Sequence, residues 1–583
     1  MKRLTYTLTS LLISSAFGAQ QSAVPEAFRS FRVPPSATLR FLASEEGRAF
    51  LKATGHPLAE PAIRAFGEPS KTIAVPPAWF ADLTTEAESP APAPSPCGGP
   101  QGARFNLEPR ANAVAQNQAS ADFLLNRVGP NEDLIVQAAN DWRGNLTSDK
   151  HWDRSVSGYY VHRAAVADCS VQFEGGLPKF SAQGVTVMGA GDPAVAADPA
   201  RDAFFMADQR IGSAMGGVGL FRVSASRLLS PSACPSGTHT EAQAASCWMA
   251  TPPALLFAQT KADSIADLPR IAVDERPTSA GVGAGNVYVV IVQFNFAAQT
   301  NTVMLASCSA TLVCAAPVLV SGSNTAAAFA DVQVRSDGLI TVSFTNMNTD
   351  GSLDVLFTTC TPAAAPSAPV CGSTTTVTQV ANPLSPILNS LTTMVNINIM
   401  DFTNPKHANR TNAGGGFTTF LTYEDCKSPF PGGVCLDAEV VMTTSADNGN
   451  TWTTPVSVDT ASGHHFFEAI STDTSTGIVN LSYMSASADK YNHEVEVMRN
   501  QIAAGAIAVG TPQRVTTILD PIDSDPQNLG FLQSDQYMGI KARGTGTVGQ
   551  SHLYTSFDST FVAGTYNGQP DHELNNTIDM LIY

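Results

Sequence analysis

The sequence predicts an all-β protein built as a β-propeller, with seven blades favoured and six as the alternative, preceded by a small, partly helical N-terminal segment. The prediction depends on two half-repeats that alternate from residue 104 to residue 583. One is a hairpin closed by a cysteine pair or a turn motif, and the other is a short acidic strand that leads into an aromatic-rich strand. Repeated four-strand units are typical of propellers. Seven units give about 68 residues each and six give about 80, whereas ordinary blades have roughly 40 to 50, so seven is the better fit.

The hairpins that define the first half-repeat can be aligned with one another. Segment 440–458 carries a turn motif, and a cysteine pair takes its place in three others, 220–255, 303–320 and 355–377. β-Branched and apolar residues on both sides of a turn indicate a hairpin. We therefore expect each cysteine pair to hold one outer hairpin of a blade.

The ten cysteines fall mostly into pairs that are close in sequence. The pairs are Cys234 with Cys247, Cys308 with Cys314, Cys360 with Cys371, and Cys426 with Cys435; Cys97 and Cys169 are paired by elimination. In an exported chain this spacing predicts disulfides, each short loop contributing roughly 2 to 3 kcal/mol in the chain-entropy model. A metal site is the alternative, but no C-x-x-C with a matching second half is present.

Acidic residues recur at the start of the strand expected to lie innermost in each blade. They are Asp122, Asp192, Asp267, Asp331, Glu468 and Asp535. Propeller symmetry would bring them around the axial opening, where they could bind a cation or a polyhydroxylated ligand. The candidate ligand-binding residues are Asp192, Asp267, Asp331 and Asp535. Two alternatives stay open: the acids cap backbone amides of turns, or one carboxyl with a raised pKa serves as a catalytic acid.

The ends of the propeller are expected to meet in one blade. The last repeat supplies three strands, within 537–540, 552–557 and 578–583. Segment 104–109 is the natural fourth strand, because pairing it with the last strands removes open sheet edges.

The residues before the propeller predict export. A basic start, Met1 to Arg3, precedes an apolar stretch and small residues near Gly18, so residues 1–18 are predicted to be a signal peptide. Residues 19–84 form the partly helical segment, 85–103 a Pro/Ala-rich linker, and 104–583 the propeller. We expect a secreted or cell-surface protein without a transmembrane segment.

Charge limits the partners of the protein. The formal net charge is -17, and only 14% of residues are charged. An acidic surface repels nucleic acid and anionic membranes. No motif requires a cofactor, and calcium is the ion that the acidic residues would suit.

One octet, Ser445 to Trp452, carries a family resemblance. Its sequence S-A-D-N-G-N-T-W fits S-x-D-x-G-x-T-W at Ser445, Asp447, Gly449, Thr451 and Trp452. It resembles the Asp-box of sialidases and other BNR-repeat β-propellers. Asp447 can bond its own backbone, Gly449 can adopt positive φ, and Trp452 can lie over the turn. The resemblance implies a sialidase-like propeller that recognises extracellular glycans or glycoproteins, while activity depends on other loops.

A sialidase of this kind would bring three arginines, a tyrosine nucleophile with a glutamate, and an aspartate to the axial pocket. The resemblance makes Arg143, Arg210, Arg270 and Tyr537 the catalytic candidates. The alternative for the Asp-Arg pairs is a local salt bridge. Phe31-Arg-Val-Pro34 departs from the family's F/Y-R-I-P motif at one position and lies before the linker.

One loop resembles a calcium site. Asn348, Asp350 and Asp354 could donate oxygens, although an Asp-Gly hairpin turn is the alternative. Two functions therefore stay open for the whole chain. One is glycan recognition, and the other is a glycoside hydrolase of the sialidase type, or a lyase, acting at the axial pocket.

Overall fold

The computed structural model describes residues 103–104, 116–130, 132–141, 155–165, 168–260, 263–296, 298–350, 352–381, 393–394, 403–427, 429–430, 434–435, 438–461, 463–487, 496–516, 538–546, 550–566 and 569–582. The predicted signal peptide, N-terminal segment and almost all of the linker lie outside these residues. Among the described residues, no helix is long and apolar enough to cross a membrane.

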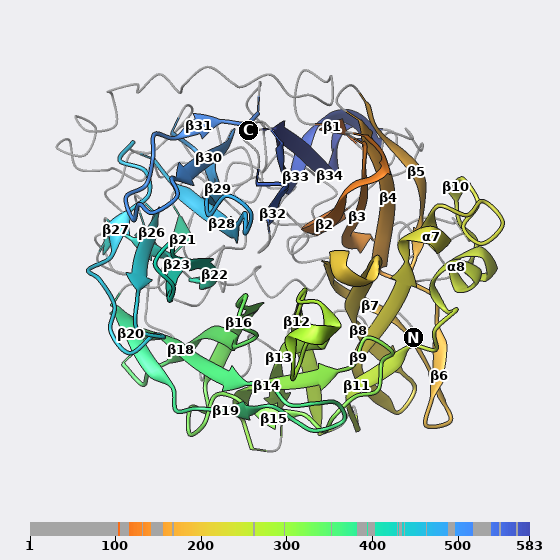
Figure 1. Ribbon diagram of the computed structural model, residues 1–583, viewed down its shortest axis with the longest axis horizontal. Coiled ribbons are helices and arrows are strands. Elements are labelled where there is room, and N and C mark those ends of the chain that lie inside the picture. The colour runs from red at the N-terminus through yellow and green to blue at the C-terminus, as the bar shows by residue number, and fades with distance from the viewer. Residues whose placement is uncertain are drawn as a thin grey trace, which may run out of the picture.

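The described part of the chain is an all-β propeller, as predicted. Seven sheets of four or five strands are arranged around a central axis (Figure 1). Their innermost strands are β2, β7, β12, β16, β22, β28 and β32, and each contacts the next, with β32 returning to β2.

The sheets are numbered here in chain order. Sheet 1 contains β2 (Gln116–Gly129), β3 (Glu132–Asp141), β4 (Ser157–Ala165), β5 (Asp168–Gly176) and β10 (Gly237–Thr238). Sheet 2 contains β6 (Phe180–Ala182), β7 (Val185–Asp198), β8 (Ala203–Gly212), β9 (Met215–Ser224) and β11 (Ala254–Thr260). Sheet 3 contains β12 (Ser264–Val273), β13 (Val287–Asn295), β14 (Thr300–Cys308) and β15 (Val318–Leu319). Sheet 4 contains β16 (Ala327–Val334), β17 (Ile340–Met347), β18 (Leu353–Thr361), β19 (Val370–Cys371) and β20 (Thr375–Val380).

The remaining sheets complete the ring. Sheet 5 contains β22 (Lys406–Thr411), β23 (Phe417–Cys426), β26 (Ala438–Ser445) and β27 (Val456–Ser457). Sheet 6 contains β28 (His465–Thr472), β29 (Val479–Ser485), β30 (Glu496–Ile502) and β31 (Gln513–Arg514). Sheet 7 contains β32 (Gly539–Gly544), β33 (Ser551–Tyr566), β34 (Gln569–Ile582) and β1 (Ala103–Arg104). A small separate sheet joins β21 (Thr393–Met394), β25 (Val434–Cys435) and β24 (Pro429–Phe430). The described helical segments are α7 (Ala225–Leu228), α8 (Glu241–Trp248), and the 3-10 turns η2 (Pro199–Arg201) and η3 (Thr278–Ala280).

The two ends of the propeller meet in sheet 7. Strand β1 pairs antiparallel with β34, with Ala103 opposite Ile578 and Arg104 opposite Thr577. The predicted closure is therefore found at the start of segment 104–109, whose other residues lie outside the described ranges.

Apolar side chains fill the spaces between neighbouring sheets. Tyr159 and Phe204 belong to one cluster between sheets 1 and 2, and Phe205 and Val289 to another between sheets 2 and 3. All four side chains are fully buried. Packing of this kind between sheets fixes the spacing of the inner strands around the axis.

A bulge interrupts the inner strands near the recurrent acids. The backbone takes positive φ at Asp192 (51°), Leu268 (54°), Phe329 (47°) and Phe467 (53°), and register shifts accompany these residues. A β-bulge bends its strand and redirects side chains. The acids consequently occupy different positions relative to the bulge in different sheets.

Three predicted disulfides are present, and one of them has a different role from the one expected. Cys308–Cys314 and Cys360–Cys371 bridge the outer hairpins of sheets 3 and 4, as predicted. Cys234–Cys247 instead ties α8 to the loop after α7, because the connection from β9 to β11 is a long excursion with two short helices. Cys426 is disulfide-bonded. Cys97 and the side chains of Cys169 and Cys435 lie outside the described residues, so the pairings that include them stay predictions.

The octet Ser445 to Trp452 forms the turn between β26 and β27. The Asp447 carboxylate accepts hydrogen bonds from the Thr451 backbone N–H (2.9 Å), the Thr451 hydroxyl (2.7 Å) and the Ser445 hydroxyl (2.8 Å). The half-buried Trp452 indole donates to the Gly449 carbonyl at 3.1 Å and packs on Phe357 of sheet 4. The octet therefore closes a turn and joins two sheets, in agreement with a structural role.

Candidate functional site

Five of the six recurrent acids are described, and each lies on an inner strand. Asp122 is in β2, Asp192 in β7, Asp267 in β12, Asp331 in β16 and Glu468 in β28. All are buried except the half-buried Asp192. They do not share one register, since the bulges displace them, and Asp535 lies outside the described residues.

Asp122 belongs to an ion-pair group across the axis, here called the axial bridge: Asp122, Glu275, Lys541 and Arg543. Arg543 of β32 donates to both Asp122 oxygens at 2.9 and 3.1 Å, and to Glu275 at 2.6 Å. Burial alone would raise the pKa of Glu275, but the charges of Arg543 and Lys541 lower it to about 2. With two acids and two bases, the axial bridge is internally neutralised and fits a structural role.

Asp331 and Asp122 also support the capping alternative. The Asp331 carboxylate accepts the backbone N–H of His407 at 3.2 Å, and Asp122 accepts that of Ala197 at 2.8 Å. Both amides belong to the next inner strand around the ring. Burial alone would raise the pKa of Asp331, but the bond and charge of His407 lower it below the usual range. These two acids therefore link adjacent sheets.

Asp192 and Asp267 form a close carboxyl pair. Burial raises the pKa of Asp267 well above the ordinary range of an aspartate, and the charge and hydrogen bond of Asp192 raise it further. Gln209 donates to Asp267 at 3.1 Å, while the Asp192 backbone N–H donates to Asn140 at 2.6 Å. Since two carboxylates in contact cannot both be ionised at low cost, the contact with Asp192 favours the protonated form of Asp267.

A second carboxyl pair joins sheets 5 and 6. Glu468 is only 2% exposed, and its carboxyl group is in hydrogen-bonding contact with the Glu424 carboxyl, while no side chain of another described residue donates an N–H or hydroxyl hydrogen bond to it. Burial and the neighbouring Glu424 raise the pKa of Glu468 well above the usual range. Glu424 accepts the backbone N–H of Asn404 at 2.9 Å, and burial raises its pKa as well. Glu468 is therefore a buried carboxyl whose side-chain partner in the described structure is a second carboxyl.

Lys406 lies beside this pair at the start of β22. Its amine donates to the Asn404 side chain at 3.0 Å, and the residue is 8% exposed. Burial, together with the positive charge of Arg270, lowers the pKa of Lys406 to about 7, although neighbouring carboxyl groups act in the opposite direction. A lysine with this pKa is partly neutral at pH 7, so it can donate a hydrogen bond or exchange a proton.

We call the two pairs and this lysine the inner carboxyl cluster: Asp192, Asp267, Glu424, Glu468 and Lys406. The Asp192–Asp267 pair joins sheets 2 and 3, and the Glu424–Glu468 pair with Lys406 joins sheets 5 and 6; Arg270, three residues after Asp267 on β12, acts electrostatically on Lys406. The cluster contains acceptors, protonated carboxyls and an amine. It can therefore bind hydroxyl-rich ligands or supply a proton.

The predicted arginine group is only partly present among the described residues. Arg210 is buried, binds Asp208 at 2.7 Å and the Pro178 carbonyl at 2.9 Å, and packs on Phe221. This is the local salt bridge that was the alternative, so Arg210 is not exposed to a ligand. Arg270 is half-buried and next to the cluster. Arg143 and Tyr537 lie outside the described residues.

The calcium-like loop forms a hairpin turn between β17 and β18. Asp350 accepts both the backbone N–H (3.0 Å) and the hydroxyl (2.6 Å) of Ser352, and the Asn348 side chain donates to the same hydroxyl. Asp354 pairs with Asn346 in the strand ladder. Across the described ranges, no three His, Cys, Asp or Glu side chains are grouped so that they could hold a metal ion. The geometry agrees with the hairpin alternative.

Sequence reasoning missed Lys406 and Glu424 and did not place Glu468 among the ligand-binding residues. Lys406 is the first residue of β22, and Glu424 lies on the second strand, β23, of the same sheet. Their importance depends on contacts between sheets. Of these three residues, only Glu468 could have been found from the sequence, because it is one of the recurrent acidic residues of the inner strands.

Comparison with known proteins gives structural neighbours only. No family model matches the chain, and no curated protein matches it. A Hadza microbial sialidase is similar in structure, with 10% identity, coverage of 82% of this chain and 93% of that chain, and a TM-score of 0.39. An N-acetylgalactosamine deacetylase from F. plautii, in complex with blood group B trisaccharide, has 9% identity, 55% and 90% coverage, and a TM-score of 0.32. A levansucrase from Bacillus subtilis has 10% identity, 55% and 83% coverage, and a TM-score of 0.29.

Proposed function

We propose that this protein is an exported propeller that binds a glycan at the inner carboxyl cluster. The observation that carries the proposal is Glu468, a buried carboxyl that contacts the Glu424 carboxyl and receives no N–H or hydroxyl hydrogen bond from the side chain of another described residue. A buried acceptor without a donor is costly, by about 1 to 3 kcal/mol. The hydroxyl groups of a sugar are donors that would remove this cost.

Several features of the cluster support a polyhydroxylated ligand. Carboxyl oxygens of Glu468 and Asp267 are acceptors, whereas the Lys406 amine and protonated carboxyls are donors. Because sugar hydroxyls both donate and accept, this mixture suits them better than it suits an ion of one charge. The axial position allows residues from several sheets to contact one ligand, as in many sites at the centre of a symmetric fold.

Export is part of the same proposal. Residues 1–18 read as a signal peptide, and the three described disulfides suit an oxidising compartment. Glycans on secreted proteins or at cell surfaces would then be accessible to the mature chain.

Glycoside hydrolysis is the second candidate, favoured by the raised pKa of Glu468. A buried carboxylic acid with a raised pKa is the group that glycosidases use to protonate a leaving group. Glu468 would be that acid; Glu424 touches it and would keep it protonated, so the second catalytic carboxylate would be a different residue. This role would require that the glycosidic oxygen approach Glu468 within hydrogen-bond distance.

A glycan array and a panel of fluorogenic glycosides would test both functions. The parent protein is expected to bind a restricted set of glycans, and an Asp192→Asn/Asp267→Asn variant to lose at least about tenfold in affinity because the carboxyl pair is removed. A control, Asp263→Asn/Glu439→Gln, removes two carboxylates outside the cluster and should bind like the parent. Binding that is unchanged in the first variant, or absent on the array, would overturn glycan recognition at this site. Turnover of any glycoside that Glu468→Gln abolishes would favour the hydrolase.

A further inference from the structure

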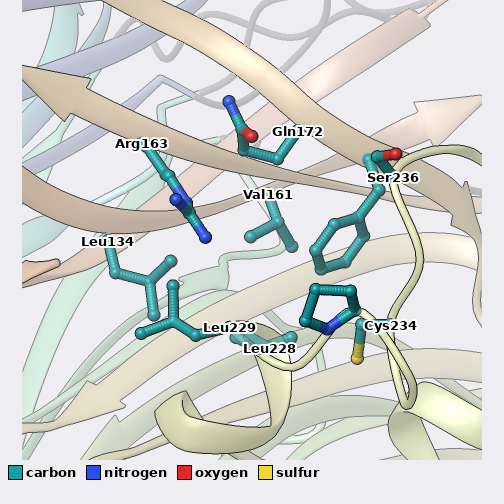
Figure 2. A pocket seen from close by; sticks show the side chains of 10 residues that line it. Leu134, Val161, Arg163, Gln172, Leu228, Leu229, Cys234 and Ser236 are labelled. Carbon is teal, nitrogen blue, oxygen red and sulfur yellow. The ribbon is translucent and has the colours of Figure 1, made fainter.

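A cavity of about 120 Å³ lies between sheet 1 and the loop that follows α7 (Figure 2). It is separate from the inner carboxyl cluster, since none of its lining residues belongs to that group. We propose that this cavity binds a small carboxylic acid with an apolar body, and that Arg163 holds the carboxylate.

Most of the cavity wall is apolar. Strands β3, β4 and β5 contribute Leu134, Val161 and Phe173, and the segment from α7 onward contributes Leu228 and Leu229. Leu134, Val161, Phe173 and Leu228 are each no more than 3% exposed. A ligand that fills this space would gain from burying apolar surface.

Arg163 supplies the positive charge. It lies on β4 opposite Leu134 and is half-buried, and its side chain forms no hydrogen bond or ion pair with a described residue. Other arginines nearby in the ring do have acidic partners: Arg127 binds Asp202 and Arg210 binds Asp208. In Figure 2 the Arg163 side chain extends toward the cavity beside Leu134 and Val161. A planar guanidinium that has no counter-ion among the described residues matches a carboxylate in charge and geometry.

The wall is held in place before any ligand arrives. The disulfide Cys234–Cys247 ties the loop to α8, and β10 pairs in parallel with β5 of sheet 1. At the other end, the Ser224 hydroxyl accepts the Arg227 N–H and caps α7. A preformed cavity avoids much of the ordering cost of binding.

The volume limits the size of the ligand. A dry cavity of roughly 150 Å³ accepts benzene in a known protein, so a single ring or a short aliphatic chain is the upper limit here. The net charge of -17 disfavours anions at long range, so binding must depend on the local contact with Arg163. Benzoate is a suitable probe because it combines one ring with one carboxylate.

Calorimetric titration of the full chain with benzoate and with neutral benzamide tests the proposal. The parent should bind benzoate at least about tenfold more tightly than benzamide, since only benzoate pairs with Arg163. Arg163→Gln should remove this preference, whereas Arg127→Gln, which loses the same charge outside the cavity, should retain it. Leu229→Trp should block both ligands by filling the space, with thermal unfolding used to check that it folds.

Three results would overturn the proposal: no saturable binding of benzoate to the parent, equal binding of benzamide, or unchanged benzoate affinity in a folded Arg163→Gln variant. The comparison of the two probes uses the parent protein alone, so it does not depend on the folding of any variant. The test is also independent of glycan binding at the inner carboxyl cluster.

Discussion

The Asp122 carboxylate accepts hydrogen bonds from the Arg543 guanidinium at both oxygens, 2.9 and 3.1 Å away, although the two residues are 421 positions apart in the chain. Their side chains are 3% and 10% exposed. The pair joins β2 to β32, the first and last inner strands, while β1 and β34 join the ends of the chain in sheet 7. The ring is thus closed both beside its axis and by strand pairing.

Loss of the Asp122 charge should destabilise the propeller. Asp122→Asn leaves Arg543 with an incomplete set of buried partners, and we expect the free energy of unfolding to fall by roughly 2 to 4 kcal/mol. Urea denaturation measures the change. Asp202→Asn is the matched control, because its pair with Arg127 is more exposed, 41% and 33% respectively, and should contribute no more than about 1 kcal/mol. Equal effects of the two substitutions would show that the buried pair does not close the ring.

The axial bridge should also produce a defined pH dependence. The pKa of Glu275 is lowered from its ordinary value of 4.5 to about 2 by Arg543 and Lys541, against the effect of burial. The lowered pKa means that its contribution is fully present above about pH 4.5 and is lost as the pH falls toward 2. Because the Glu275 side chain is 34% exposed and solvent screens its ion pairs, Glu275→Gln should reduce the free energy of unfolding by roughly 1 to 2 kcal/mol at pH 7, and by progressively less below pH 4.5.

Urea unfolding curves of the parent and of Glu275→Gln, recorded between pH 2.5 and 7, measure how the difference in free energy of unfolding changes with pH. Glu132→Gln is a control, as Glu132 has no ion pair among the described residues. A stability difference that stays constant across the range would contradict the assignment of the shift to Glu275.

The turn Ser445 to Trp452 offers a test that separates backbone strain from packing. Gly449 has φ of 84°, and a Cβ there would collide with the Phe357 ring. Gly416 has φ of 75° with no atom close to its Cβ position. Gly416→Ala should cost about 1 kcal/mol through its backbone alone, and Gly449→Ala roughly 2 to 4 kcal/mol because the collision is added. Thermal unfolding measures the loss of stability in each variant. Equal losses would contradict the close contact between Gly449 and the Phe357 ring of sheet 4.

The fold could be predicted from the sequence because it depends on local residue patterns that repeat along the chain. Hairpins flanked by β-rich runs, the spacing of Cys308 with Cys314 and Cys360 with Cys371, and a spare strand before the first repeat all follow from neighbouring residues. Cys234 with Cys247 shows the limit of this reasoning. Their pairing was predictable, but the helices between β9 and β11 made the role of the disulfide different.

The candidate site was harder to predict from the sequence, since it depends on where each side chain lies along the inner strand that carries it. Residues with positive φ, such as Leu268 and Phe467, are not glycines, so nothing in the sequence marks the bulges that shift Asp267 and Glu468. The position of Lys406 beside Glu468 is likewise a contact between sheets 5 and 6. A pattern of recurrent acids predicts their strands but cannot predict which of them meet.

The most direct test of glycan binding at the inner carboxyl cluster is calorimetric titration of Glu468→Gln with the glycan that the parent binds best on the array. Glutamine keeps the shape of the side chain but loses the carboxyl pair with Glu424, so we predict at least about a tenfold loss of affinity with folding intact. Glu439→Gln, on the third strand of sheet 5, β26, should bind like the parent. Unchanged affinity in a folded Glu468→Gln variant would contradict the account.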